Sequence, residues 1–449
     1  GYNIHINGLF HCTVRYKQLL HFHEQLTKES SQPLPQFPPK KLFPLTVNQQ
    51  EERRLCLEKY IQTIGQTSTL NNCTLLNSFL LQAQQETSEK IGVLENLDIF
   101  LQNGQRIALK VSTSENSSRV LKKICRNLNL PPEFDRYFAL FAIIEGETNA
   151  NILRRLQDFE SPVLTLGNIN FSAVKIVVGK NYWETENDVK LMENPVALNL
   201  LFVQAAAELK RRWILPNVEE EEILKELIAE GRKRDFLELV RNCRFYGFLQ
   251  FAPCFCDYPE PNTRVLVTIG KNELNLRMLL ENEEEHESVF KVTRMRCWRI
   301  TTLHNGADNS GDYSLELSFE YLIARNELQW ITIASEQAIL MSVSLQGMID
   351  ELLVKNSVEK KDEGKSWSYI MRDGQTKVPI GGDEEKSWRE EKKDEKEDKG
   401  REKTGREKQE TFTEVRRVVK GKKFEKKGSQ QHCDIMENNA FHMIGDDDL

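Results

Sequence analysis

Three short segments near the start of the chain place cationic side chains on three different expected elements. Arg15-Tyr16 ends an alternating hairpin, Lys40 closes a proline-rich loop, and Arg53 lies in the first turns of an expected helix. Arginine offers a planar fork for phosphate, lysine a point charge, and tyrosine a flat face for a sugar-like ring. The set predicts a site for one phosphorylated ring, because nucleic acid would need a longer basic stripe.

In this order and spacing the segments resemble the PX domain, a phosphoinositide-binding module, over residues 1–88. The resemblance implies that Arg15 holds the 3-phosphate and that Tyr16 stacks on the inositol ring. It also implies that Lys40 contacts the 1-phosphate and that Arg53 holds the 4- and 5-hydroxyls. The chain opens at Gly1 inside the expected sheet, so the family's first strand is expected to be missing. A plain hairpin followed by a solvated basic helix is the alternative.

Composition limits the remaining possibilities. A chain of 449 residues has room for about three domains, and its net charge of −7 argues against a general nucleic-acid binder. Neither a signal peptide nor an apolar run near the ~20 residues of a membrane span is present. Nine cysteines without a repeated spacing suit reduced thiols in the cytosol. No metal site and no cofactor are expected.

The middle of the chain changes pattern twice. Alternating apolar residues around Asn103-Gly104 predict a hairpin, which is followed by a helix at Ser117–Leu128 and a strand at Tyr137–Ile144. Hairpin, helix and strand in this order are typical of a ubiquitin-like fold, predicted for 92–181. A helical signal then predicts a small bundle over 182–260, with the clearest segments at Val196–Arg211 and Glu219–Asn242.

Strand patterns return from Arg264 and end in one amphipathic helix, Glu336–Lys355. Antiparallel strands capped by a single helix predict a phosphotyrosine-binding or pleckstrin-like sandwich over 261–355. The segment 356–433 is rich in both charges and poor in aliphatics, so it cannot offset its ordering entropy. We expect a disordered tail over 356–449 that ends in a short binding motif.

These three lobes follow the order of a FERM module, so the predicted fold is an α+β multidomain chain with PX followed by FERM. That combination resembles the PX-FERM sorting nexins. Three strings carry the resemblance to one branch of this family: Tyr2–Gly8, Lys291–Arg299 and Ile444–Leu449.

The third lobe should carry a peptide site. In such sandwiches an extended peptide adds to an open strand edge beside the last helix. Here the edge is expected at Val289–Thr301. The resemblance implies that the groove takes Asn-Pro-x-Tyr or Asn-x-x-Tyr motifs from receptor tails. The expected contacts are Arg296, Trp298, Ile349 and Leu353, although Trp298 also fits a core position.

The chain ends in an apolar residue behind three acids, which suits capture of the terminal carboxylate in a basic-rimmed pocket. A frayed acidic end is the alternative. The resemblance implies that this ending engages the Retriever recycling complex. The expected contacts are Ile444, Gly445, Asp446, Asp447, Asp448 and Leu449.

No nucleophile and base set, phosphate-cradling loop or His-Glu-x-x-His motif is visible, so no catalytic residue is proposed and no enzyme is expected. The resemblance implies a cytoplasmic adaptor, peripheral on early endosomes, that binds phosphatidylinositol 3-phosphate and returns receptors to the plasma membrane. It leaves open a small GTPase as a partner of the first lobe. A FERM-type membrane–cytoskeleton linker is the alternative, and the Arg15-Tyr16 and Lys40 segments argue against it.

Overall fold

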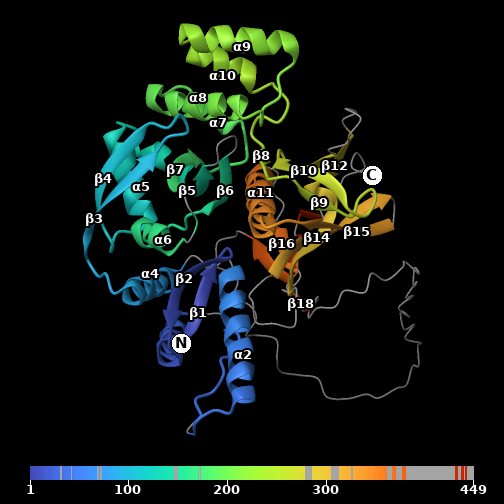
Figure 1. Ribbon diagram of the computed structural model, residues 1–449. Helices are drawn as coiled ribbons and strands as arrows, with labels where there is room; N and C mark the ends of the chain where they lie inside the picture. Colours follow the sequence, from blue (N-terminus) through green and yellow to red (C-terminus); the bar gives the residue numbers. More distant parts are fainter. Residues whose placement is uncertain are drawn as a thin grey trace, which may run out of the picture. The chain divides into compact units, whose positions relative to one another are not determined.

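The computed structural model places the helices and strands of the chain in the order of Figure 1. The compact unit that carries most of them comprises Gly1–Leu303, Tyr313–Glu351 and Gln430–Leu449, and the second unit comprises His304–Asp312 and Leu352–Ser429. The structure describes residues 1–30, 33–41, 43–67, 70, 73–145, 150–169, 171, 173–278, 286–304, 313–324, 327–361, 367–370, 377–380, 430–432, 436–438 and 440–441.

The N-terminal part is a two-stranded hairpin packed on helices. Asn7 and Gly8 both adopt positive φ (49° and 82°), as a type I′ turn requires, so the predicted hairpin is confirmed. Phe22, Tyr60 and Leu80 belong to the buried core under the hairpin. The elements are β1 (Tyr2–Ile6), β2 (Leu9–Val14), α1 (Tyr16–Glu29), α2 (Val47–Gln66) and α4 (Thr74–Ser88).

The first lobe of the predicted FERM module is a five-stranded sheet in the order β4-β3-β7-β5-β6, with β3 and β7 parallel. The predicted helix at Ser117–Leu128 is confirmed as α5, and its Val120 and Ile124 are fully buried in the same core as the sheet. The elements are β3 (Leu94–Phe100), β4 (Arg106–Ser112), α5 (Ser117–Asn127), η1 (Pro132–Tyr137), β5 (Phe138–Glu145), β6 (Ala150–Arg155), α6 (Pro162–Asn168) and β7 (Val174–Lys180).

The second lobe is helical, as predicted, but one predicted segment is divided. Glu219–Asn242 forms two helices, because α9 ends at Gly231, whose left-handed φ of 70° closes the helix. Leu224, Phe236 and Leu237 fill the core of the lobe. The elements are α7 (Asn187–Leu191), α8 (Pro195–Lys210), α9 (Val218–Glu230) and α10 (Lys233–Val240).

The third lobe is an antiparallel sheet capped by α11, whose stripe of Met341, Leu345, Met348 and Ile349 is buried as predicted. The elements are β8 (Leu249–Gln250), β9 (Cys254–Cys256), β10 (Thr263–Gly270), β11 (Glu273–Met278), β12 (Glu287–Lys291), η2 (Val292–Arg294), β13 (Met295–His304), β14 (Tyr313–Ala324), β15 (Glu327–Ala334) and α11 (Ala338–Lys361).

The prediction of one continuous edge strand over Val289–Thr301 is wrong in its first part. A 3-10 turn at Val292–Arg294 divides the segment, and β12 pairs with β11 while β13 follows β14 in the sheet order. The two halves therefore belong to opposite ends of the sheet, and only β13 remains as the candidate peptide edge.

Four short strands follow α11. The second unit contains β16 and β17, which pair with each other, while β18 and β19 pair with β13. The rest of the segment predicted to be disordered, 356–433, lies outside the described residues apart from the end of α11. The strands are β16 (Trp367–Ile370), β17 (Lys377–Ile380), β18 (Gln430–His432) and β19 (Met436–Glu437).

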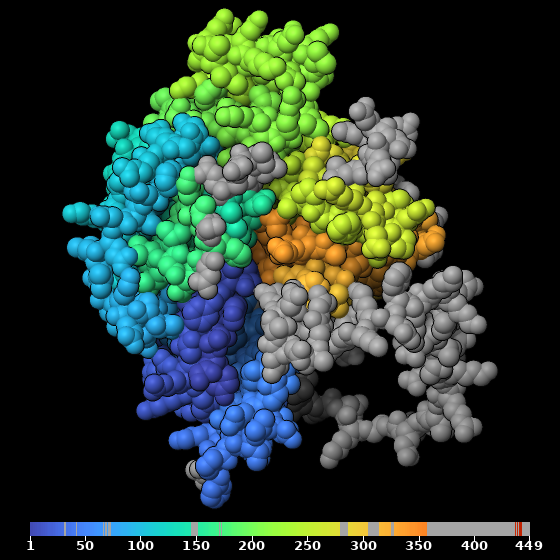
Figure 2. Space-filling model, in the orientation of Figure 1, coloured from blue at the N-terminus to red at the C-terminus, as the bar shows by residue number. Residues whose placement is uncertain are grey.

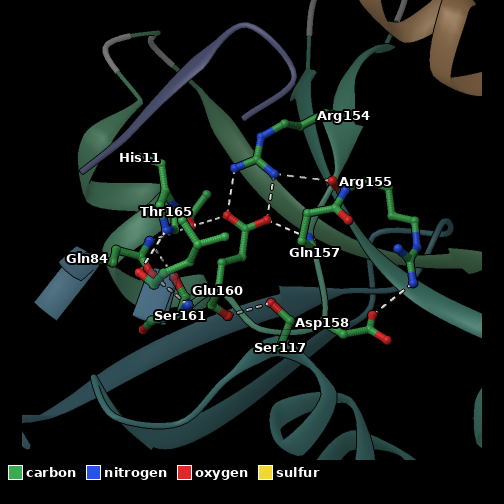
Figure 3. Close-up of polar contacts among 11 residues, drawn as sticks. His11, Gln84, Ser117, Arg154, Arg155, Gln157, Asp158, Glu160, Ser161 and Thr165 are labelled. Carbon is green, nitrogen blue, oxygen red and sulfur yellow. Dashed lines mark hydrogen bonds and ion pairs between the residues drawn. The ribbon is translucent and has the colours of Figure 1, made fainter. Parts of the chain in front are cut away.

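A buried ion pair lies next to the junction between the N-terminal part and the first lobe (Figure 3). Arg154 and Glu160 are 1% and 0% exposed and form two parallel contacts, of 2.5 Å between Nη1 and Oε1 and 2.6 Å between Nη2 and Oε2. The Thr165 hydroxyl and the Gln157 amide also donate to this carboxylate. Burial acts to raise the pKa of Glu160, but these donors together hold it below its ordinary value.

The same network reaches into the N-terminal part. Gln84, on α4, donates to the Thr165 hydroxyl at 3.0 Å and accepts from the Ser161 amide at 2.8 Å. Asn168 donates its side-chain amide to the carbonyl of His11. A continuous chain of buried hydrogen bonds therefore joins α4 to α6 and to the ion pair.

We predict that Glu160→Gln strongly destabilises the protein, because Arg154 keeps its buried charge without a partner. Breaking a buried pair in this way costs about 3–5 kcal/mol. Asp158→Asn is the matched control, since its pair with Arg155 is exposed and is expected to contribute under about 1 kcal/mol. Urea unfolding followed by circular dichroism measures both, and equal losses would contradict a special role for the buried pair.

Candidate functional site

The first candidate site is built around Tyr16, at the start of α1. Its hydroxyl donates to the carbonyl of Pro38 at 2.8 Å, which ties the proline-rich loop to the helix. The guanidinium carbon of Arg53, on α2, lies 4.3 Å from the centre of the Tyr16 ring. Burial raises the pKa of Tyr16, and the nearby Arg53 acts in the opposite direction. Tyr16 thus brings the hairpin end, the loop and α2 together.

Two adjacent arginines on α2 have different roles. Arg54 is held by Glu51 through Nε and Nη2, and by Glu58 through Nη1 at 2.9 Å. No ion pair of Arg53 is found among the described residues. Arg53 therefore remains available to a ligand, and its role in lipid binding stays a prediction.

The other two predicted cations flank the same tyrosine. Arg15 precedes Tyr16 directly and its backbone amide donates to Gln18, while its side chain is exposed. Lys40 is exposed two residues beyond Pro38. The assignments of Arg15, Tyr16, Lys40 and Arg53 to particular groups of a lipid remain predictions.

The second candidate site is the edge of β13, and a segment from the end of the chain occupies it. Met436 pairs with Trp298 and Glu437 pairs with Cys297 in an antiparallel ladder. After Glu437 the segment forms a tight turn, in which the amide of Phe441 donates to the carbonyl of Asn438 at 3.1 Å. An extended strand followed by a turn is therefore the shape that this edge accepts.

Asn438 makes the most contacts at this edge and is 3% exposed. Its side-chain amide donates to the carbonyls of Val292 and Met295 at 2.8 and 2.6 Å, and its own amide donates to the carbonyl of Arg296 at 3.0 Å. Its side-chain oxygen accepts from Ala440 at 2.9 Å. The 3-10 turn before β13, which the sequence analysis missed, presents one of these carbonyls.

The predicted peptide contacts have different environments. Trp298 is fully buried and its indole donates to Ser342 at 2.9 Å, and Ser342 in turn donates to the sulfur of Met436 at 3.4 Å. The docked segment, through Met436, therefore contributes to the surroundings that bury Trp298. Arg296 contributes its carbonyl and pairs its side chain with Glu320.

On α11, Ile349 is 2% exposed and lies on the buried stripe of the helix, while Leu353 is partly buried. Contacts of these two side chains with a peptide stay a prediction.

Sequence reasoning missed the docked segment although a signal was present. Asn438 and Phe441 have the spacing of the Asn-x-x-Tyr motif expected in the groove, with phenylalanine in place of tyrosine. The predicted partner-binding residues Ile444–Leu449 follow it and lie outside the described residues. Nothing in the first lobe tests a small GTPase as its partner, which the sequence analysis left open.

Family models match successive parts of the chain. They are the PX domain over residues 2–83, the sorting nexin 17/27/31 FERM domain F1 lobe over 95–183, the sorting nexin 17/31 FERM domain F2 lobe over 184–244 and the Sorting Nexin 17 FERM C-terminal domain over 247–353.

Curated relatives cover most of the chain. Sorting nexin-17 of Danio rerio is 43% identical over 368 residues and that of Homo sapiens 44% over 367, each covering 80% of this chain and 78% of the relative. Sorting nexin-31 of Homo sapiens is 33% identical, covering 84% of this chain and 88% of the relative.

A PX domain followed by three FERM lobes defines a class of adaptor that binds phosphoinositide through one module and receptor tails or other proteins through the other. The chain belongs to the PX-FERM sorting nexins, with relatives among sorting nexins 17 and 31. The predicted family and fold class are confirmed. The protein is an endosomal sorting adaptor rather than an enzyme, and it associates peripherally with endosomal membrane. Membership of this adaptor family disfavours the alternative of a membrane–cytoskeleton linker. No helix of the described residues could cross a membrane.

Proposed function

We propose that this adaptor binds phosphatidylinositol 3-phosphate on early endosomes, holds Asn-Pro-x-Tyr or Asn-x-x-Tyr receptor tails on β13, and passes them to Retriever through Ile444–Leu449. The receptors then return to the plasma membrane. The observation that carries the proposal is the Asn438-x-x-Phe441 turn on the β13 edge.

The docked turn supports the class of receptor motif. The carbonyls that receive the Asn438 amide belong to the backbone of the lobe and select asparagine by geometry. Each such hydrogen bond contributes roughly 0.5–1.5 kcal/mol, and a wrong side chain leaves the carbonyls unpaired. Phe441 stands where the motif carries its aromatic residue, so a Tyr or Phe ring fits the same register.

The strand before the turn, Met436–Glu437, adds affinity through backbone pairing, which requires little of the peptide's sequence. Backbone pairing gives a β-augmented peptide its binding energy, and the side chain at alternate positions gives selectivity. Met436, two residues before Asn438, accepts a hydrogen bond from the Ser342 hydroxyl through its sulfur and pairs with Trp298 in the ladder. An apolar residue at that position of a receptor motif therefore fits the groove.

The cationic set around Tyr16 supports the lipid ligand. Arg15, Lys40 and Arg53 come from three elements that Tyr16 and Pro38 connect, so one anionic headgroup can be contacted from three sides. Apolar Phe43 and Val47 are 83% and 80% exposed in the adjoining loop and at the start of α2. Such side chains favour the boundary between headgroups and acyl chains.

We predict that Arg53→Gln weakens binding to liposomes containing phosphatidylinositol 3-phosphate by about tenfold or more, since a charged hydrogen bond contributes roughly 1.5–3 kcal/mol. Arg54→Gln is the matched control, because Glu51 and Glu58 already hold that guanidinium. Arg15→Gln should behave like Arg53→Gln. Liposome flotation measures all three, and equal losses for Arg53 and Arg54 would refute the assignment.

We predict that deleting 430–449 raises the affinity for an Asn-Pro-x-Tyr peptide by about tenfold or more, because a tethered competitor at high effective concentration is removed. Full-length Asn438→Ala should have the same effect. Deletion of 442–449 alone is the control, since it keeps the turn on β13. Calorimetry measures the affinities, and no gain in either variant would mean that receptor peptides do not use this edge.

We predict that removing Leu449, or adding one residue after it, abolishes co-precipitation with Retriever, because either change separates the terminal carboxylate from its apolar anchor. Binding to lipid and receptor peptide should be retained in both variants. Arg54→Gln serves as a control that leaves the chain end intact. Normal Retriever co-precipitation by the Leu449-deleted protein would rule out this role for the ending.

A further inference from the structure

A cavity of about 430 Å³ lies where β5, β6 and β7, helix α8 and helix α11 meet, all within one compact unit. Gln337, at the start of α11, donates to the carbonyl of Ile152 on β6, and Glu351 on the same helix accepts from the amides of Trp183 and Glu184. These contacts hold the walls together. The volume falls within the range of sites that bind small molecules, ≈ 300–1,000 Å³.

Flat aromatic side chains form much of the wall: Phe141, Trp183, Trp213 and Phe248. Two glycines leave room for them. A Cβ on Gly347 would lie 3.0 Å from the indole nitrogen of Trp183, and one on Gly179 would lie 3.1 Å from the ring of Phe141. Because glycine has no side chain, the rings of Trp183 and Phe141 can lie against the backbone at these two positions.

Two acidic side chains line the cavity, and both oxygens of one of them, Glu351, already accept from backbone amides. Glu208, on α8, is 8% exposed, and its Oε1 accepts from Gln204 at 2.8 Å. Neither an ion pair of Glu208 nor a hydrogen bond of its Oε2 is found within the described part of the chain. Burial raises the pKa of Glu208, although Lys180, Gln204 and Arg211 act to lower it. A carboxyl buried in this way is stabilised by a cation brought into the cavity.

Three cations line the cavity, and each has a partner of its own. Arg155 pairs with Asp158 at 2.8 Å, although its buried Nε has no hydrogen-bond partner among the described residues. Lys180 lies over the rings of Tyr182 and Tyr246 and 3.6 Å from Asp188. Arg211 donates to Gln102 and lies over the ring of Trp213. Of the two acidic groups that line the cavity, Glu208 is therefore the one with an oxygen for which no hydrogen bond is found among the described residues.

We propose that this cavity binds a small organic cation with a planar aromatic ring, whose ring stacks among Phe141, Trp183 and Phe248 and whose cationic group donates to Glu208. The site is separate from the lipid and peptide sites and goes beyond the proposed function. The ligand class follows from aromatic walls with one buried acidic group, which is how proteins recognise aryl amines and amidines.

The probe is benzamidine, titrated into the full-length protein by calorimetry and ligand-observed NMR. We expect saturable binding that Glu208→Gln weakens about tenfold or more, since the charge-assisted hydrogen bond is lost. Glu226→Gln, on the exposed side of α9, is the matched control and should bind as the unmodified protein does. Benzyl alcohol and propylamine, which supply only a ring or only a cation, should both bind more weakly.

A second variant makes the test independent of Glu208. Val343 lines the cavity and is 38% exposed, so Val343→Trp fills the space from its rim without disturbing the core. Loss of benzamidine binding in this variant, with an unchanged thermal midpoint, supports the site. Absence of saturable binding, or equal affinity in the Glu208→Gln, Val343→Trp and Glu226→Gln variants, overturns it.

Discussion

The buried pair of Arg154 and Glu160 is the constraint on which the junction between the PX domain and the first FERM lobe depends. Two buried charges are tolerated when they pair closely and further hydrogen bonds satisfy their other polar atoms. Thr165 and the Gln157 amide also donate to the carboxylate of Glu160, and Gln84 of the PX domain extends the network. Among the described residues only the Nε of Arg154 is left without a partner in this pair. Because directional contacts tolerate little displacement, the lipid-binding module and the lobe beside it are held as one body.

The β13 edge poses a different problem, because an open strand edge exposes unpaired amides and carbonyls. The chain covers it with its own segment, and Asn438 donates to one carbonyl of the turn before β13 and to one at the start of the strand. The unpaired amides and carbonyls that would favour aggregation at this edge are also the groups that can select a particular segment. Under the proposed function, a receptor motif would pair with the same backbone groups that the tail segment now satisfies.

Much of the architecture was predictable because its signals are local. Asn7-Gly8 can adopt the left-handed angles of a tight hairpin turn, and the α11 stripe repeats at helical spacing. The cations around Tyr16 could be selected by the order of short motifs and the family resemblance, and the structure adds that Glu51 and Glu58 hold the neighbouring Arg54. The helix break at Gly231 was also local and was missed, since charged helical residues continue on both sides.

The sequence by itself determined the order of the modules, the hairpins and helix faces, and the family, because these depend on neighbours along the chain. Only the tertiary structure decided that Met436 and Glu437 pair with β13, that Glu208 faces an aromatic cavity, and that β12 and β13 separate. Such contacts join residues far apart in the sequence, as with Trp298 and Met436, which are about 140 positions apart. No local periodicity encodes them, since they depend on which surfaces remain unpaired once the lobes have folded.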